Sequence, residues 1–137
     1  MLFRSDNVKV NAKLTDFGSA RNINIMMTNM TFTKGIGTPK FMAPELLNKK
    51  KYKKSADIYS FAITMLECYT WKEAFPKELF KFPWDIADCV VEGNRPQTIN
   101  EIENLQMKDL IELSWKQDPT ERLSIDKIIE RLENILK

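Results

Sequence analysis

The sequence predicts a mainly α-helical fold made by one domain. The chain has 137 residues, of which 43% are hydrophobic, which matches the size and apolar content of a single compact domain. From residue 44 to the C-terminus, apolar residues recur at helical spacing in several segments. Alternation with a period of two is confined to one short stretch before residue 16. We therefore expect a short N-terminal strand, a long loop and then about five helices.

The predicted strand covers residues 8–15. Val8, Val10, Ala12 and Leu14 alternate with polar residues, which is typical of a strand with one buried face. The strand would lead directly into Asp16 and bring that carboxylate to a site.

A long loop is predicted to follow, over residues 19–40. No periodicity is sustained there, and Gly35 and Gly37 interrupt the segment. Long loops inside compact domains are usually functional or disordered.

Two helices are predicted next, over residues 44–48 and 55–69. Pro44 can open the first because its missing N–H would have no helical partner at that position. The second is apolar nearly all round, so we expect it at the centre of the domain. Its predicted main face carries Ile58, Phe61, Ala62, Met65, Leu66 and Tyr69, with Tyr59, Ile63 and Cys68 on the other sides.

The C-terminal half is predicted to contain a loop over residues 71–83 and three more helices. The first of these helices covers residues 84–92 and is ended by Gly93. The next covers residues 102–115 and is halted at Asp118-Pro119, because a residue before proline is disfavoured in the helical region. Ser124 is a candidate N-cap for the last helix, whose apolar stripe runs from residue 125 to residue 136.

The net charge of the chain is too close to zero to indicate a nucleic-acid or membrane partner. Lysine and arginine number 21 and aspartate and glutamate 19, which leaves a net charge of +2. The lysines of residues 49–54 could attract acidic partners, or form a solvated connection between two helices. Tyr52 is the one aromatic residue among them, so we predict no nucleic-acid partner.

The cysteines and the N-terminus predict an intracellular, cytoplasmic protein. Cys68 and Cys89 lack metal-ligand spacing and the chain has no histidine, so we expect reduced thiols. The N-terminus turns polar after three residues, which does not fit the apolar core of a secretory signal. No stretch is long enough in apolar residues to cross a membrane.

Five motifs follow one another along nearly the whole chain. They are Asp16-Phe17-Gly18, then Gly37-Thr38 with Ala43-Pro44-Glu45, then Asp57-Ile58-Tyr59-Ser60-Phe61, then Gly93-Asn94-Arg95-Pro96, and finally Trp115 with Asp118-Pro119 and Arg122. An isolated Asp-Phe-Gly recurs by chance, but this ordered series resembles the C-lobe of a eukaryotic protein kinase over about residues 8–137. The resemblance implies a partial kinase domain over residues 1–137, with the strand and activation loop in 8–45 and the helical C-lobe in 46–137.

The first motif resembles the part of a kinase that meets the nucleotide. By that resemblance, Asp16 is the magnesium ligand, Phe17 packs so as to orient it, and Gly18 gives the turn its freedom. ATP and Mg²⁺ are therefore the cofactors expected of the full-length kinase. We expect neither to be bound by this chain alone.

The segment Gly37-Thr38-Pro39 resembles the substrate-docking loop of serine/threonine kinases. This implies a protein substrate with a serine or threonine hydroxyl as acceptor. The turn at residues 93–96 and the arrangement from Trp115 to Arg122 resemble the tyrosine-kinase-like group, whose members mostly phosphorylate serine and threonine.

The activation loop offers four candidate phosphorylation sites. Ser19, Thr28, Thr31 and Thr33 lie there, and a phosphate on one of them could order the loop by pairing with arginine or lysine. The alternative is an ordinary polar loop.

Four further residues are predicted to be structural. In the family, the residue at Glu45 forms a buried ion pair with an arginine where Arg122 stands. Asp57 resembles the aspartate that holds the catalytic-loop backbone, although it could equally serve as a charge near a helix N-terminus. Trp115 is predicted to pack in the core, since it follows Ile111 at helical spacing.

The parts of a kinase that perform the chemistry are expected to be absent. A working kinase needs a glycine-rich loop, an ATP-pairing lysine and a catalytic loop with a base aspartate. Asp6 and Asn11 superficially imitate that loop, but Asn11 lies too close to Asp16. With the N-lobe and catalytic loop absent, we predict no catalytic residue in the chain.

Two functions follow from these predictions. The first is the C-terminal part of a serine/threonine kinase, inactive as this isolated chain. The second is a non-catalytic kinase-like binding or scaffold module, whose exposed apolar surface would lead to self-association or to a partner.

Overall fold

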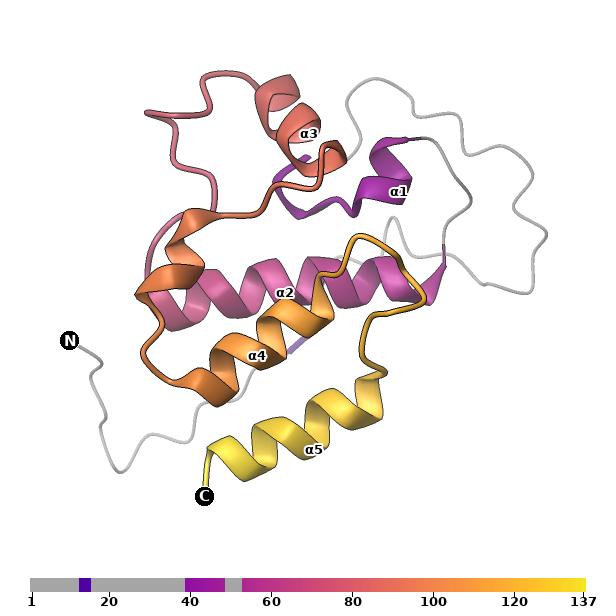
Figure 1. Cartoon of the computed structure of the whole chain (residues 1–137), viewed down its shortest axis with the longest axis vertical. Coiled ribbons are helices and arrows are strands. Elements are labelled where there is room, and N and C mark those ends of the chain that lie inside the picture. Colours follow the sequence, from indigo (N-terminus) through magenta and orange to yellow (C-terminus); the bar gives the residue numbers. More distant parts are fainter. Residues whose placement is uncertain (1–12, 16–38, 49–52) are drawn as a thin grey trace.

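The computed structural model describes residues 13–15, 39–48 and 53–137 (Figure 1). Within these ranges the fold is mainly helical, as expected. The elements are η2 (Pro39–Phe41), α1 (Pro44–Leu47), α2 (Lys54–Thr70), α3 (Pro83–Val91), η3 (Gln97–Glu101), α4 (Leu105–Ser114) and α5 (Ile125–Ile135).

Most of the predicted strand lies outside the described residues. Residues 13–15 have no regular secondary structure, and Leu14 is 88% exposed. The expected burial of Leu14 is therefore wrong. An alternating pattern gives a stable strand only where neighbouring strands or packed helices support it, and the described ranges contain no strand.

Helix α2 crosses the middle of the molecule (Figure 1). Helix α4 packs against it, and α5 packs on α4 farther out. Helices α1 and α3 pair on the opposite side of α2, and η2 contacts both α2 and α3. This arrangement confirms the central position expected of α2.

The buried face of α2 overlaps the predicted one only in part: Ala62, Met65 and Leu66 are buried as expected. Tyr59 and Ile63 are fully buried, whereas Phe61 and Tyr69, on the predicted main face, are 39% and 41% exposed. Neighbours contact α2 from several directions, so on a helix that is apolar nearly all round the periodicity does not select the inner face. The buried hydrophobic residues of the core are Ala43, Ala56, Tyr59, Ala62, Ile63, Met65, Leu66, Ala74, Phe75, Val90, Ile99, Ile102, Met107, Leu110, Ile111, Trp115 and Ile128.

Helix α3 ends as its sequence predicts. Gly93 adopts a φ of +92°, its N–H donates to the Val90 carbonyl, and the Asn94 N–H donates to the Cys89 carbonyl. These two bonds form a Schellman motif, which glycine favours because it has no Cβ. At the other end, Asp85 accepts a hydrogen bond from the Phe82 N–H.

Helix α4 is shorter than predicted at both ends. Its N-cap is Asn104, whose side chain accepts a hydrogen bond from the Met107 N–H at 3.0 Å. Ile102 instead lies buried in the connection after η3. The helix ends at Ser114, four residues before Asp118, so proline is not what terminates it.

Helix α5 begins after the predicted cap. Ser124 accepts a hydrogen bond from the Lys127 N–H, and the apolar stripe keeps its helical spacing. Ile128 is fully buried against the core, but Ile125 and Ile129 are about half exposed. The rest of the protein therefore covers α5 along only a narrow strip of its surface.

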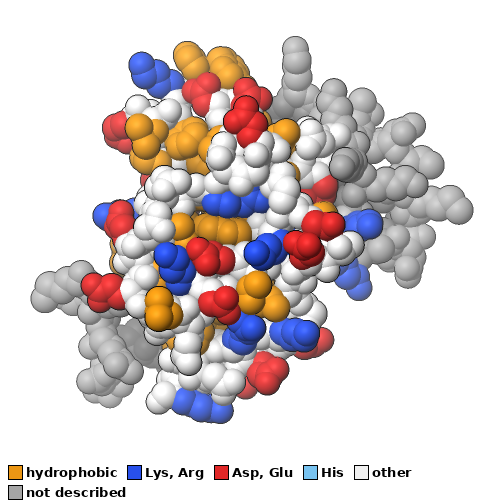
Figure 2. All heavy atoms as spheres, viewed as in Figure 1, with side chains coloured by type: hydrophobic (Ala, Val, Ile, Leu, Met, Phe, Trp, Pro, Cys, Tyr) orange, Lys and Arg blue, Asp and Glu red, His pale blue; other side chains and the backbone are white. Residues whose placement is uncertain are grey.

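The surface carries charges of both signs. Figure 2 shows acidic and basic side chains interspersed over one face, with hydrophobic side chains gathered at the end of that face near α3. Among the described residues, no helix is long and apolar enough to span a membrane.

Candidate functional site

A buried ion pair joins α1 to the connection between α4 and α5. The two terminal nitrogens of Arg122 each lie 2.7 Å from one carboxylate oxygen of Glu45, and both side chains are almost completely buried. Such bidentate pairs are among the strongest polar contacts in proteins. The structure thus brings together two of the residues singled out in the sequence, 77 positions apart.

Arg122 also makes contacts beyond this pair. Its Nε donates to the Lys116 carbonyl, and Nη1 donates to the Ser55 carbonyl, each at 2.8 Å. One guanidinium therefore ties α1, the start of α2 and the segment after α4 to one another.

Tyr59 of α2 lies close to two guanidinium groups. The Arg95 and Arg122 guanidinium carbons are 5.2 Å and 5.3 Å from the centroid of its ring. Its hydroxyl is buried and has no hydrogen-bond partner among the described residues. Burial raises the pKa of Tyr59 to about 12, although the two nearby positive charges act in the opposite direction.

Arg95 connects two motifs that lie far apart in the sequence. Its Nε donates to the Trp115 carbonyl at 3.1 Å, and Nη2 donates to Gln117 Oε1 at 2.6 Å. The turn at residues 93–96 is thereby held against the end of α4. Trp115 itself is 5% exposed and packs in the core.

The start of the segment that leads into α1 is fixed on α2. Pro39 opens η2, and the hydroxyl of Ser60 donates to the Phe41 carbonyl at 2.7 Å. Lys40 Nζ lies 2.9 Å from Glu67 Oε1. Two side chains of α2, two helical turns apart, thus contact η2.

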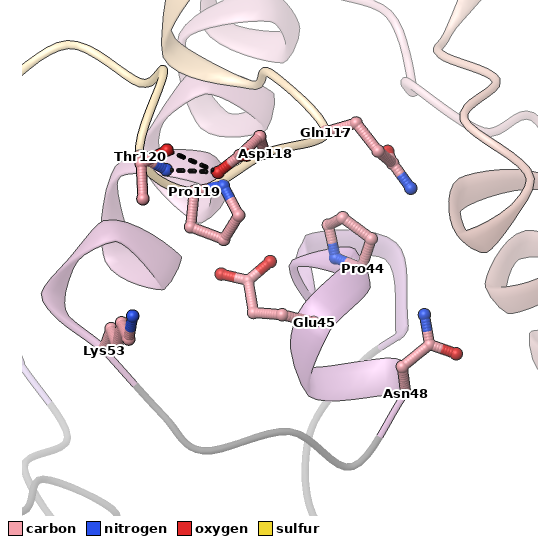
Figure 3. Close-up of a pocket in the computed structure, with 8 residues that line it drawn as sticks. All are labelled: Pro44, Glu45, Asn48, Lys53, Gln117, Asp118, Pro119 and Thr120. Atoms are coloured by element: carbon pink, nitrogen blue, oxygen red, sulfur yellow. Dashed lines mark hydrogen bonds between the residues drawn. The ribbon is translucent and has the colours of Figure 1, made fainter.

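A hollow of about 390 Å³ lies beside the ion pair, between α1, the start of α2 and the turn after α4 (Figure 3). Its lining residues are Pro44, Glu45, Asn48, Lys53, Gln117, Asp118, Pro119 and Thr120. Hydrogen bonds from the Thr120 hydroxyl and N–H lower the pKa of Asp118. The buried carboxylate in this lining, that of Glu45, is already paired with Arg122.

The predicted nucleotide-facing residues lie outside the described ranges. These are Asp16, Phe17, Gly18, the phosphosite candidates Ser19, Thr28, Thr31 and Thr33, and the docking-loop residues Gly37 and Thr38. Asp57 is exposed in the first turn of α2. In residues 13–15, 39–48 and 53–137, no three acidic, cysteine or histidine side chains are placed to hold a metal ion.

The roles of Arg95, Tyr59 and Glu67 were not predicted from the sequence. Arg95 belongs to a recognised motif, but nothing local shows that it reaches the end of α4. A signal did exist for Ser60 and Glu67, because they are polar residues seven positions apart on a largely apolar helix. Polar side chains that share one face of a buried helix need partners, which indicates a contacting segment.

Comparison with known proteins identifies the family. The family model described as the protein kinase domain matches residues 1–132. The chain is 34% identical over 127 residues to the probable serine/threonine-protein kinase roco8 of Dictyostelium discoideum. This alignment covers 93% of the chain and 6% of that relative.

Two further relatives show how widely the similarity extends. The chain is 33% identical over 139 residues to the dual specificity protein kinase shkC of Dictyostelium discoideum, with 98% of the chain and 26% of the relative covered. It is 34% identical over 125 residues to serine/threonine-protein kinase STY46 of Arabidopsis thaliana, with 91% and 21% covered. The chain thus spans about a quarter or less of the length of these curated relatives. Because the family model matches almost all of its residues, the chain belongs to the protein kinase domain family.

Proposed function

We propose that this chain is the C-lobe part of a serine/threonine protein kinase of the tyrosine-kinase-like group. The complete protein would transfer phosphate from ATP to hydroxyl groups of protein substrates. The observation that carries the proposal is the buried pair between Glu45 and Arg122, which ties the Ala43-Pro44-Glu45 motif to the helical platform. In a kinase this motif anchors the loop that presents the substrate.

The residues before this anchor would supply the nucleotide and substrate contacts. Asp16 is proposed as the magnesium ligand, with Phe17 and Gly18 orienting it, over a strand and activation loop in 8–45. Gly37, Thr38 and Pro39 are proposed as the substrate-docking loop, followed by the helical C-lobe in 46–137. Regulation by phosphate at Ser19, Thr28, Thr31 or Thr33, and a cytoplasmic location, are predictions from the sequence.

Serine and threonine are the proposed acceptors. The docking segment resembles that of serine/threonine kinases, and two of the relatives above are described as serine/threonine-protein kinases. The third is described as a dual specificity kinase. Phosphoamino-acid analysis of a labelled substrate therefore tests whether the acceptors are serine and threonine and not tyrosine.

The alternative is a non-catalytic binding or scaffold module. The observation that favours it is an exposed aromatic pair, Phe82 and Trp84, whose rings stack with centroids 4.5 Å apart while the residues are 50% and 60% exposed. Leu79 and Trp71, in the loop before them, are more than 70% exposed. Apolar groups of this size at a surface favour association.

The purified 137-residue chain is expected to show no phosphotransfer. Asp16 alone cannot hold the nucleotide in an attack geometry, and the sequence offers no base aspartate for the acceptor hydroxyl. The measurement is transfer of labelled phosphate to a mixture of serine-, threonine- and tyrosine-containing peptides, with Asp16→Asn as the matched variant. Transfer by the wild-type chain that Asp16→Asn abolishes would contradict the predicted inactivity.

A further inference from the structure

We infer that Glu67 is a positioning residue for substrate binding. It would act through Lys40, which lies in η2 at the described end of the proposed docking loop. This inference rests on the proposed function, because η2 has a substrate to position only if the complete protein is a kinase. Two partly buried side chains of α2, those of Ser60 and Glu67, contact η2.

The ion pair between Lys40 and Glu67 is partly shielded from solvent. Lys40 Nζ lies 2.9 Å from Glu67 Oε1, and the two side chains are 21% and 20% exposed. The same ammonium group lies 4.8 Å from the centroid of the Phe41 ring, so it is held on two sides. By comparison, the side chains of the pair between Lys72 and Glu101 are 57% and 48% exposed.

Glu67 is itself fixed in place by the backbone. Its Oε1 accepts a hydrogen bond from the Ala74 N–H at 2.7 Å, and Ala74 is buried in the core. Trp71, between them, ends α2 with a φ of +55°, which turns the chain back toward Glu67. The carboxylate therefore meets Lys40 in a position already set by the end of α2.

A second contact on α2 makes the orientation of η2 specific. The Ser60 hydroxyl holds the Phe41 carbonyl, while Glu67 holds the Lys40 side chain. Contacts at two successive residues fix both the position and the rotation of the turn. Without the pair, η2 would keep the Ser60 hydrogen bond and its contacts with α3 but lose the attachment of Lys40. The turn would then be held less precisely, which weakens substrate binding but leaves the nucleotide site unchanged.

Three variants separate this role from general stability. Lys40→Met removes the charge and keeps an apolar stem, and Lys40→Arg keeps the charge within reach of Glu67. Glu67→Gln removes the carboxylate charge but keeps an oxygen that can accept from the Ala74 N–H. The matched control is Lys72→Met, which breaks the more exposed pair by the same chemical change.

The first measurement is hydrogen exchange of the Met42 amide in the 137-residue chain. This N–H donates to the Pro39 carbonyl at 3.0 Å and reports whether the η2 turn is closed. We expect exchange about two- to fivefold faster in Lys40→Met and Glu67→Gln, and no change in Lys40→Arg or Lys72→Met. Exchange in Lys40→Met equal to that of the wild type would overturn the inference.

The second measurement uses the native kinase that contains this chain. Lys40→Met and Glu67→Gln should raise KM for a protein substrate severalfold, with KM for ATP and kcat unchanged, and Lys40→Arg should restore the wild-type KM. A fall in kcat with an unchanged KM for the protein substrate would also overturn the inference. If the wild-type protein transfers no phosphate, the proposed function fails, and the exchange measurement alone decides whether Glu67 positions η2.

Discussion

Replacing Glu45 with glutamine is expected to lower the free energy of unfolding by about 3–5 kcal/mol. The variant leaves the Arg122 guanidinium buried with a neutral partner, and a buried charge without its counter-ion is costly. Arg122 also holds the Lys116 and Ser55 carbonyls, so α1, α2 and the segment after α4 should loosen together. Urea unfolding followed by tryptophan fluorescence measures the change.

A matched control distinguishes the buried pair from ordinary surface charges. Asp109→Asn breaks the pair between Asp109 and Arg131, whose side chains are 57% and 41% exposed, by the same change from carboxylate to amide. It should cost no more than about 1 kcal/mol. Equal losses in Glu45→Gln and Asp109→Asn would show that the buried pair is not the anchor of this fold.

Replacing Tyr59 with phenylalanine is expected to change how stability depends on alkaline pH. In the folded chain the pKa of Tyr59 is raised to about 12 by burial. The unfolded chain loses the phenol proton near its ordinary pKa of about 10, so between these values the folded state binds more protons. The free energy of unfolding of the wild type should therefore fall by about 2 kcal/mol more than that of Tyr59→Phe between pH 9 and pH 12.

The same variant should not be destabilised at neutral pH. The Tyr59 hydroxyl is buried without a hydrogen-bond partner among the described residues, so its removal relieves the desolvation of a polar group. Tyr69→Phe is the control, since Tyr69 is 41% exposed on the same helix. A loss of stability in Tyr59→Phe at pH 7, or parallel pH profiles for wild type and variant, would be inconsistent with a buried, unpaired phenol.

The sequence predicted the helices well because their signals are local. Pro44 opens α1, Gly93 closes α3 and Ser124 caps α5, and each acts through backbone groups within a few residues of itself. The start of α4 was predicted at residue 102 but lies at Leu105, and here too the cause is a local signal. The cap at Asn104 competes with the apolar pattern that begins at Ile102, and the cap determines where the helix begins.

The full extent of the inner face of α2 and most of the site contacts could not be predicted in this way. Which side of an apolar helix is buried depends on the helices that pack on it, and these come from distant parts of the chain. The contacts of Arg95 with Trp115 and of Lys40 with Glu67 are likewise tertiary. The pair between Glu45 and Arg122 was expected from the resemblance to a family, since no local pattern joins residues 77 positions apart.

The mass and activity of the native product test the proposed function most directly. An antibody against a peptide from residues 100–137 would isolate that product from cell extract, followed by incubation with labelled ATP and phosphoamino-acid analysis of a protein substrate. We predict a product several times larger than the 16.0 kDa of this chain that labels serine and threonine. A native product near 16 kDa that transfers no phosphate would contradict the proposal and favour the non-catalytic module.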